Sequence, residues 1–143
     1  MVEPDASTEP TRVAIAIVRR EARFLVRIRP PGGPMPGVHE FAGGKSEADE
    51  TPEDTARREG FEEIGMRLSI LGLRSRFVHR YAHGLIDLHY FDAVPDPLDS
   101  EPSHESGFYW VNALDLPRLT FPPANESVIA DLVREYGTGS SQA

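Results

Sequence analysis

The stretch of this sequence that most constrains its fold runs from Gly43 to Met66 and reads GGKSEADETPEDTARREGFEEIGM. A glycine pair and a short acidic loop come first, and the start of a helix follows. Thr51 is a favourable N-cap, Pro52 suits the first helical position, and Gly65 suits the left-handed position that ends many helices. The sequence therefore predicts a helix from Pro52 to Ile64, reached through the glycine pair.

The predicted helix carries three glutamates that fall on one side of it. At about 100° per residue, Glu59, Glu62 and Glu63 lie within an arc of about 100°. Like charges three or four positions apart repel by about 0.2–0.5 kcal/mol per pair. Hard divalent cations such as Mg²⁺ are held by carboxylate oxygens gathered in this way, although a solvated acidic surface is the common alternative. The other side of the helix carries Ala56, Gly60, Phe61 and Ile64.

The spacing of these residues resembles a known motif. Its fixed positions are Gly44, Glu50, Arg58, Glu59, Glu62, Glu63 and Gly65. Their pattern, GX5EX7REUXEEXGU with U a bulky apolar residue, resembles the Nudix box. Gly60 departs from the box, which has a large aliphatic residue there. Glycine inside a helix costs about 1 kcal/mol relative to alanine, and Phe61 is the candidate to compensate for the missing side chain by packing.

The resemblance to Nudix hydrolases implies a metal-dependent site. The implied ligands of Mg²⁺, or of Mn²⁺ in its place, are three carboxylates and one backbone carbonyl, those of Glu59, Glu62, Glu63 and Gly43. Glu59 is the candidate for the general base or for the metal ligand beside it. Glu50 and Arg58 have two interpretations. They form an ion pair that braces the loop against the helix, or they take part in catalysis, Glu50 through a water-mediated contact with the metal.

A second segment of the chain resembles one branch of this family. Phe121–Leu132, FPPANESVIADL, is similar to the C-terminal segment of the MutT-like Nudix enzymes, which hydrolyse oxidised dGTP, and the similarity extends from Val13 to Leu132. The implied substrate-binding residues are Arg29, Phe41, Gly44, Lys45 and Asn125. For Asn125 the alternative is a cap on the last helix, a position that asparagine also suits.

Glu101 and Glu105 are two of the acidic residues ahead of the last predicted strand. MutT-like enzymes often carry an additional acidic residue in this region, and Glu105 is the candidate for such a metal ligand here. Glu101 is expected to be a solvated loop acid. The histidines His79, His83 and His89 are assigned no role.

The activity implied by the resemblance is Mg²⁺-dependent hydrolysis of a nucleoside triphosphate to a nucleoside monophosphate and pyrophosphate. Oxidised dGTP is the leading substrate, and the implied role is sanitation of the nucleotide pool, a form of DNA repair. Two alternatives remain open. One is a Nudix hydrolase of another diphosphate, such as a nucleotide sugar or a dinucleotide, and the other is a non-catalytic module that only binds nucleotide.

Composition limits the partners that this chain of 143 residues can have. Its net charge of −8 argues against binding to duplex nucleic acid, which needs a basic surface. A nucleotide is still compatible, because a divalent cation bridges acidic protein to phosphate. No run approaches the about 20 apolar residues of a membrane span, and the absence of cysteine excludes disulfides. We expect a cytoplasmic monomer that does not bind membranes.

The remaining pattern predicts a single α/β domain over residues 11–136, between disordered tails at residues 1–10 and 137–143. The apolar run VAIAIV at residues 13–18 is typical of a strand covered on both faces. Further strands are expected at residues 24–29, 39–42, 68–81 with an interruption at Gly72, 85–94 and 107–112. A closing helix after Asn125 carries apolar residues up to Tyr136. We expect an α/β/α sandwich, a mixed sheet between the box helix and the C-terminal helix.

Overall fold

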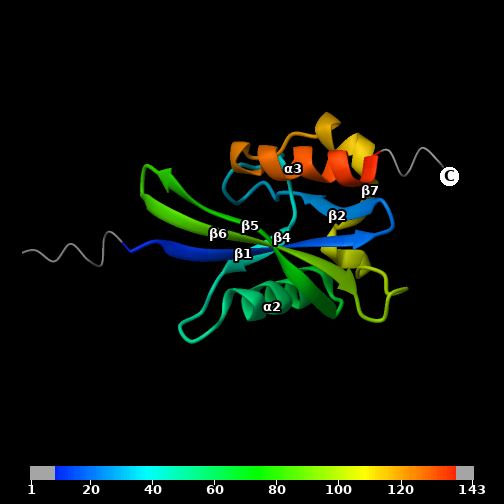
Figure 1. Cartoon of the computed structure of the whole chain (residues 1–143), viewed down its shortest axis with the longest axis horizontal. Helices are drawn as coiled ribbons and strands as arrows, with labels where there is room; N and C mark the ends of the chain where they lie inside the picture. The colour runs from blue at the N-terminus through cyan, green and yellow to red at the C-terminus, as the bar shows by residue number, and fades with distance from the viewer. Residues whose placement is uncertain (1–8, 138–143) are drawn as a thin grey trace, which may run out of the picture.

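The computed structural model describes residues 9–137, which form a mixed β-sheet between two helices (Figure 1). Helix α2 (Pro52–Ile64) covers one side of the sheet, and α3 (Glu126–Leu132) covers the other. The predicted α/β/α sandwich is therefore confirmed. Most of the two tails that the sequence predicts to be disordered, residues 1–8 and 138–143, lies outside the described residues.

The strands agree with the predicted ones, with small shifts at their ends. They are β1 (Thr11–Arg20), β2 (Arg23–Ile28), β3 (His39–Glu40), β4 (Ala42–Lys45), β5 (Leu68–Tyr81), β6 (Gly84–Pro95) and β7 (Tyr109–Asn112). The short strand expected at residues 39–42 is divided at Phe41 into β3 and β4. As a result, the glycine pair lies inside β4 and not in the loop that follows it.

Strand β1 is the central strand of the sheet, whose order is β3-β2-β1-β6-β5, with β7 on β2. It runs parallel to β6 over residues 11–18, and on its other edge it is antiparallel to β4 and then to β2. Both edges of the apolar run are thus paired. The β5–β6 register shifts between Ile70 and Gly72, close to the interruption predicted at Gly72.

Side chains of β1 alternate between two apolar cores. Ala14 and Ala16 face α2, while Ile15 and Ile17 face α3. The small alanines let α2 lie close to the strand, because packed interiors leave few voids. The core on the α2 side also contains Leu25, Ala56, Ile64, Met66, Leu68, Phe91 and Phe108. The core on the α3 side also contains Phe24, Phe41, Tyr90, Leu116, Val128, Ile129 and Leu132.

Helix α2 has the predicted ends. Thr51 Oγ1 accepts a hydrogen bond from Asp54 N at 3.1 Å, and Gly65 ends the helix with a φ of 84°. Both ends of this helix were predictable from sequence, because each depends on the preference of a single residue. Thr51 favours the N-cap, and Gly65 favours the left-handed conformation that ends a helix.

The expected role of Phe61 is wrong. Its side chain is 57% exposed, because the buried stripe of α2 is narrow and consists of Thr55, Ala56, Gly60 and Ile64. The space beside Gly60 is filled instead by Leu68, the first residue of β5. A Cβ atom on Gly60 would overlap Leu68 Cδ1 and lie 3.3 Å from Leu68 Cγ.

The C-terminal region is less regular than the single helix predicted. Helix α3 ends at Leu132, and a π-helical turn, Val133–Gly137, continues it. The Tyr136 ring still packs on Phe24, with 5.5 Å between the ring centres. Three 3-10 turns connect the last elements: His104–Ser106, Ala113–Arg118 and Pro123–Asn125. Among residues 9–137, no helix is long and apolar enough to cross a membrane.

Candidate active site

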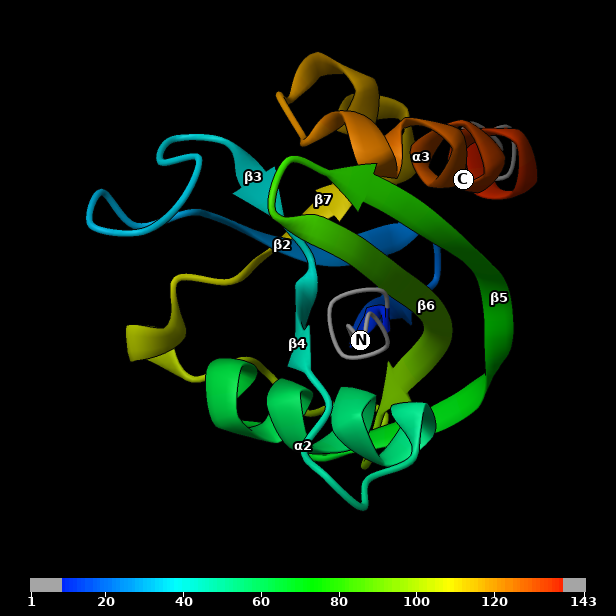
Figure 2. The same cartoon turned by 90° about the vertical axis from the view of Figure 1, so that its left-hand side faces the viewer.

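The glycine pair brings the backbone of β4 against α2. Figure 2 shows β4 running down to the helix. A Cβ on Gly43 would collide with the backbone of Ala14 and Ile15 in β1, and a Cβ on Gly44 would overlap the carboxylate of Glu59. Gly43 N donates a hydrogen bond of 3.1 Å to Glu63 Oε1. Because no side chains intervene, the backbone of β4 lies directly against the glutamates.

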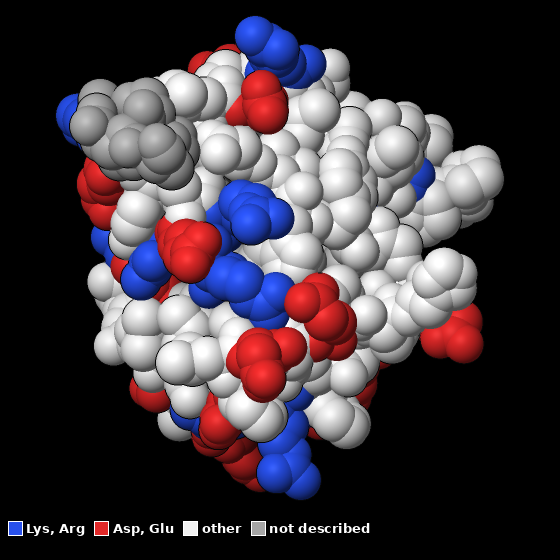
Figure 3. All heavy atoms as spheres, turned by 90° about the vertical axis from the view of Figure 1, so that its right-hand side faces the viewer, with Lys and Arg blue, Asp and Glu red and all other residues white. Residues whose placement is uncertain are grey.

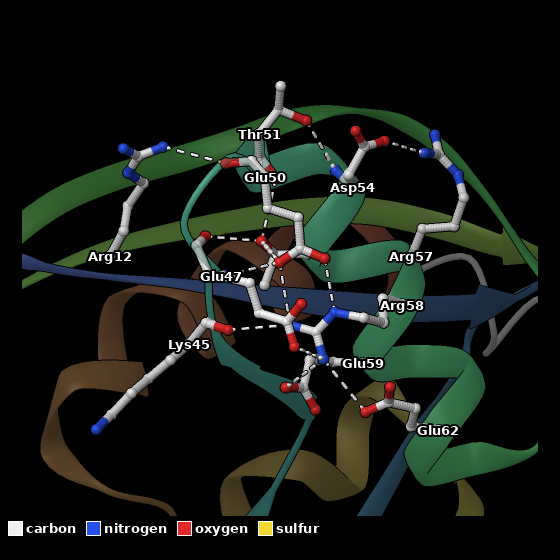
Figure 4. Close-up of polar contacts among 12 residues, drawn as sticks. Arg12, Lys45, Glu47, Glu50, Thr51, Asp54, Arg57, Arg58, Glu59 and Glu62 are labelled. Carbon is white, nitrogen blue, oxygen red and sulfur yellow. Dashed lines mark hydrogen bonds and ion pairs between the residues drawn. The ribbon is translucent and has the colours of Figure 1, made fainter.

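Glu50 and Arg58 form an ion pair with two hydrogen bonds (Figure 4). Arg58 Nε lies 2.6 Å from Glu50 Oε2, and Arg58 Nη2 lies 3.0 Å from Glu50 Oε1. Glu50 Oε1 also accepts from Glu47 N at 2.9 Å, and Arg58 Nη2 donates to the Lys45 carbonyl at 3.1 Å. Hydrogen bonds from Arg58, followed by that from the Glu47 backbone, lower the pKa of Glu50 to about 2. The pair therefore braces the loop after β4 against α2, as one of its two interpretations predicts.

The same guanidinium also reaches two of the box glutamates. Arg58 Nη1 lies 3.3 Å from Glu59 Oε2 and 3.2 Å from Glu62 Oε1 (Figure 4). One cationic nitrogen thus sits between two carboxylates that come from adjacent turns of α2. Their oxygens are placed to share a positive charge, which is what a bound divalent cation requires.

Two of the box carboxylates, Glu63 and Glu59, have raised pKa values. Burial raises the pKa of Glu63 to about 7, against the opposing effects of the Gly43 hydrogen bond and of Arg27. Burial also raises the pKa of Glu59, and Arg58 opposes that change. Carboxylates taken out of water in this way need a positive partner to be charged at neutral pH.

The donor set fits Mg²⁺, since every candidate ligand is an oxygen. Glu59 and Glu63 lie against β4 at Gly44 and Gly43, and Arg58 links Glu62 to Glu59. Mn²⁺ accepts the same donors. Within residues 9–137, no group of three or more acidic or histidine side chains already converges on one point. Glu105 is in the exposed turn His104–Ser106, and its role as a further ligand stays a prediction.

The cap interpretation of Asn125 is wrong. Its side chain makes no capping hydrogen bond to α3. Instead Asn125 is 6% exposed, and its Oδ1 accepts a hydrogen bond of 2.6 Å from the Tyr90 hydroxyl. The backbone at Asn125 is in the helical region, because the 3-10 turn Pro123–Asn125 leads directly into α3. A capping residue instead has an extended backbone. Base recognition by Asn125 stays a prediction.

The other predicted substrate-binding residues have different surroundings. The Phe41 ring is buried and stacks on Phe121, with 5.2 Å between the ring centres. Arg29 donates from Nε to Glu40 Oε1 at 3.0 Å and from Nη1 to the Pro34 carbonyl at 3.0 Å. The ammonium group of Lys45 points away from the glutamates (Figure 4).

Sequence reasoning missed Arg27 and Glu40. Glu40 accepts hydrogen bonds from Arg27 Nε at 2.8 Å and from Arg29 Nε at 3.0 Å, so Arg27 of β2 and Arg29 just after it share one carboxylate. The alternation of side chains along β2, continued by one residue beyond its end, places residues 27 and 29 on the same side. That period was visible in the sequence, but the pairing of β2 with β3, which brings Glu40 beside them, was not.

Glu101 is exposed, as predicted, and it is also paired. It accepts hydrogen bonds from Arg20 Nη1 at 2.7 Å and from Trp110 Nε1 at 3.2 Å, and the Arg20 guanidinium lies over the Trp110 ring. On the face at the right of Figure 1, basic and acidic side chains lie next to one another (Figure 3). Positive charge on this face is therefore largely compensated by neighbouring acids.

Comparison with known proteins agrees with this geometry. A profile of the NUDIX domain family matches residues 13–131. The chain belongs to the Nudix family. It is 33% identical over 127 residues to the 8-oxo-dGTP diphosphatase of Escherichia coli, covering 86% of this chain and 96% of that protein. It is 29% identical over 114 residues to the CTP pyrophosphohydrolase of the same organism, covering 79% and 84% respectively.

The fold agrees with that of solved Nudix proteins. The structure of a MutT protein from Staphylococcus aureus superposes with a TM-score of 0.72 at 24% identity, covering 90% of this chain and 98% of that one. The predicted membership in the Nudix hydrolases, the Nudix fold and the class of enzyme, a pyrophosphohydrolase, are thereby confirmed. Nudix hydrolases act on small nucleotides and generally use divalent metal ions.

Proposed function

We propose that this chain is a Mg²⁺-dependent nucleoside triphosphate diphosphatase that converts oxidised dGTP to the monophosphate and pyrophosphate. The observation that carries the proposal is the contact of two box glutamates with the glycine strand: Glu59 lies beside Gly44, and Glu63 accepts a hydrogen bond from Gly43 N. Arg58 Nη1 links Glu59 to the third, Glu62. The identity of 33% with the E. coli 8-oxo-dGTP diphosphatase, across 96% of that protein, supports the substrate. The role that follows is sanitation of the nucleotide pool, in a cytoplasmic monomer.

The side chains have different roles in this proposal. A bound Mg²⁺ neutralises charge on the phosphate chain and lowers the pKa of a water. Glu59, Glu62 and Glu63 supply the oxygens that hold it, and Glu59 is our candidate to accept the proton of the attacking water. Arg58 and Glu50 hold the loop that ends β4 against the helix, so we assign them positioning roles.

Base recognition is assigned to Asn125. The Tyr90 hydroxyl occupies Asn125 Oδ1, and the Nδ2 group is then the donor available to a carbonyl acceptor on the base. A buried amide discriminates between bases because an incorrect base leaves its hydrogen-bonding groups unpaired. Arg29, directly after the end of β2, is assigned to the nucleotide, and Lys45, at the end of β4, is assigned to a part of the substrate away from the box glutamates.

A pyrimidine triphosphate is the second candidate substrate, because the chain is 29% identical to a CTP pyrophosphohydrolase. An assay panel separates the two. Purified protein with Mg²⁺ is given oxidised dGTP, dGTP, CTP, dCTP, a nucleotide sugar and a dinucleotide, and the products are separated by chromatography. We expect monophosphate and pyrophosphate from oxidised dGTP, at a kcat/KM well above that for dGTP. A preference for CTP would replace the first candidate by the second, and absence of turnover would leave only a nucleotide-binding module.

A further inference from the structure

Arg27, on β2, holds its guanidinium beside a partly buried carboxylate of the site, that of Glu63. Arg27 Nη2 lies 3.9 Å from Glu63 Oε1, the oxygen that also accepts the hydrogen bond from Gly43 N. A separation of 3.9 Å is too long for a hydrogen bond. The positive charge of Arg27 is therefore close to Glu63, but the Arg27 N–H groups donate no hydrogen bond to Glu63.

Two neighbours fix the guanidinium in place. Its Nε donates to Glu40 Oε2 at 2.8 Å, and its Cζ lies 4.8 Å from the centre of the Phe108 ring. Phe108 is 6% exposed and belongs to the core on the α2 side, so the ring is a rigid platform. An arginine held in this way loses little conformational entropy when it binds an anion.

The terminal nitrogens of Arg27 keep their donors available. Among the contacts of the described residues, Arg27 hydrogen-bonds through Nε alone, whereas Arg29 and Arg58 also use terminal nitrogens. Its side chain is 24% exposed, so these nitrogens are reachable from solvent. A guanidinium edge with two unused nitrogens matches the paired oxygens of a phosphate.

We propose that Arg27 binds the phosphate chain of the substrate, donating from Nη1 and Nη2 to non-bridging phosphate oxygens next to Glu63. The inference rests on the proposed function, since it places the phosphates at the box glutamates. Glu40 then acts as a positioning residue, because it orients the guanidinium through Nε. The positive charge would attract phosphate into a site that is otherwise rich in carboxylates.

The test is the binding of inorganic pyrophosphate in the presence of Mg²⁺, measured by calorimetry on the full chain. The variants are Arg27→Gln and Arg27→Lys, with Arg23→Gln as the matched control. Arg23 is on the same strand and the same side of it, but it is exposed and lies at the opposite end. We expect Arg27→Gln to weaken binding by about 10- to 100-fold, the usual loss for a charge-assisted hydrogen bond, and Arg27→Lys to recover part of it. Arg23→Gln should bind as the parent does.

Two further readouts distinguish phosphate binding from a purely structural role. With whichever triphosphate the protein hydrolyses, Arg27→Gln should raise KM for the triphosphate, while the affinity for the nucleoside alone stays the same. If Arg27 only pairs with Glu40, the variant will melt at a lower temperature yet bind pyrophosphate normally, which overturns the proposal. Failure of the parent protein to bind pyrophosphate also overturns it. Neither result depends on which base is preferred, so an incorrect substrate assignment would be recognised separately.

Discussion

Leu68 occupies the volume that a side chain at Gly60 would need. The two residues face each other across the contact between α2 and β5, and a Cβ on Gly60 would overlap Leu68 Cδ1. Leu68 itself is 4% exposed, so it has little room to move aside. The departure from the Nudix box at Gly60 is thus compensated by a residue beyond the box.

This relationship predicts that Gly60→Leu destabilises the protein. Overpacking a core costs about 1–3 kcal/mol, and the gain of about 1 kcal/mol from removing a helical glycine offsets part of it. We expect a lower melting temperature for Gly60→Leu, and recovery when Leu68→Ala is added to the same chain. Equal melting temperatures for Gly60→Leu and the parent would show that Leu68 finds another rotamer.

Glu62→Gln should remove most activity and little stability. The side chain of Glu62 is 54% exposed, and among the described residues its ion pair is with Arg58, an i,i+4 contact at the surface. Such pairs contribute about 0–1 kcal/mol. If Glu62 helps to hold the catalytic cation, we expect kcat to fall by about 100-fold or more, as for the loss of one charge-stabilising group.

Glu53→Gln is the control for this experiment. Glu53 is on the same helix, is 53% exposed and pairs with Arg57 in the same i,i+4 arrangement. Its removal should leave both kcat and the melting temperature unchanged. Similar activity in the two variants would contradict the metal assignment.

The Glu50–Arg58 pair predicts a loss of stability in acid. The pKa of Glu50 is lowered from 4.5 to about 2 in the folded protein, mainly by Arg58. A lowered pKa gives stability above pH 4.5 that disappears as the pH falls through about 2. We expect Glu50→Gln to unfold at lower urea concentration than the parent at pH 7, and the difference to shrink steadily between pH 4.5 and pH 2. A constant difference over this range would exclude the ion pair as its source.

The raised pKa of Glu63 predicts the opposite dependence of stability on pH in the metal-free protein. Burial raises its pKa from 4.5 to about 7, so the folded state favours the protonated form. The associated stability is complete below pH 4.5 and is lost as the pH rises through about 7. Without divalent metal, we expect the melting temperature of the parent to fall over this range relative to that of Glu63→Gln. Added Mg²⁺ should stabilise the parent more at pH 8 than at pH 5, because binding needs the charged carboxylate.

Tyr90→Phe should weaken base discrimination. The hydroxyl of Tyr90 fixes Asn125 Oδ1, and both residues are buried. Removing it leaves a buried acceptor unpaired, at a cost of about 1–3 kcal/mol. We expect a lower melting temperature and a smaller ratio of kcat/KM between oxidised dGTP and dGTP, whereas Tyr81→Phe, at an exposed position, should alter neither. An unchanged ratio in Tyr90→Phe would argue against Asn125 as the base-reading residue.

Local features of this chain were predictable from sequence. Both ends of α2 follow from Thr51 and Gly65, whose preferences depend on a few neighbouring atoms. The Glu50–Arg58 pair could be proposed as one of two interpretations, because the box fixes their spacing. The order of strands and helices also followed from apolar periodicity.

Features that depend on distant contacts were not predictable. The period of α2 placed Phe61 on the buried side, but the width of the buried stripe depends on which strands the helix covers. Asn125 suits a helix cap in isolation, and only the position of Tyr90 on β6 gives its side chain another partner. In the same way, the fixed orientation of Arg27 results from Glu40 and Phe108, which tertiary structure brings to β2.

The central place of β1 has a consequence for the protein during its synthesis. One of the two edges of β1 is completed only by β6, which is synthesised more than 60 residues after it. Until then the apolar run at residues 13–18 has no partner along that edge. Pairing across such a distance is slow, because a long loop must close first. This edge of β1 is therefore open to non-native strand pairing until β6, which ends at Pro95, has been made.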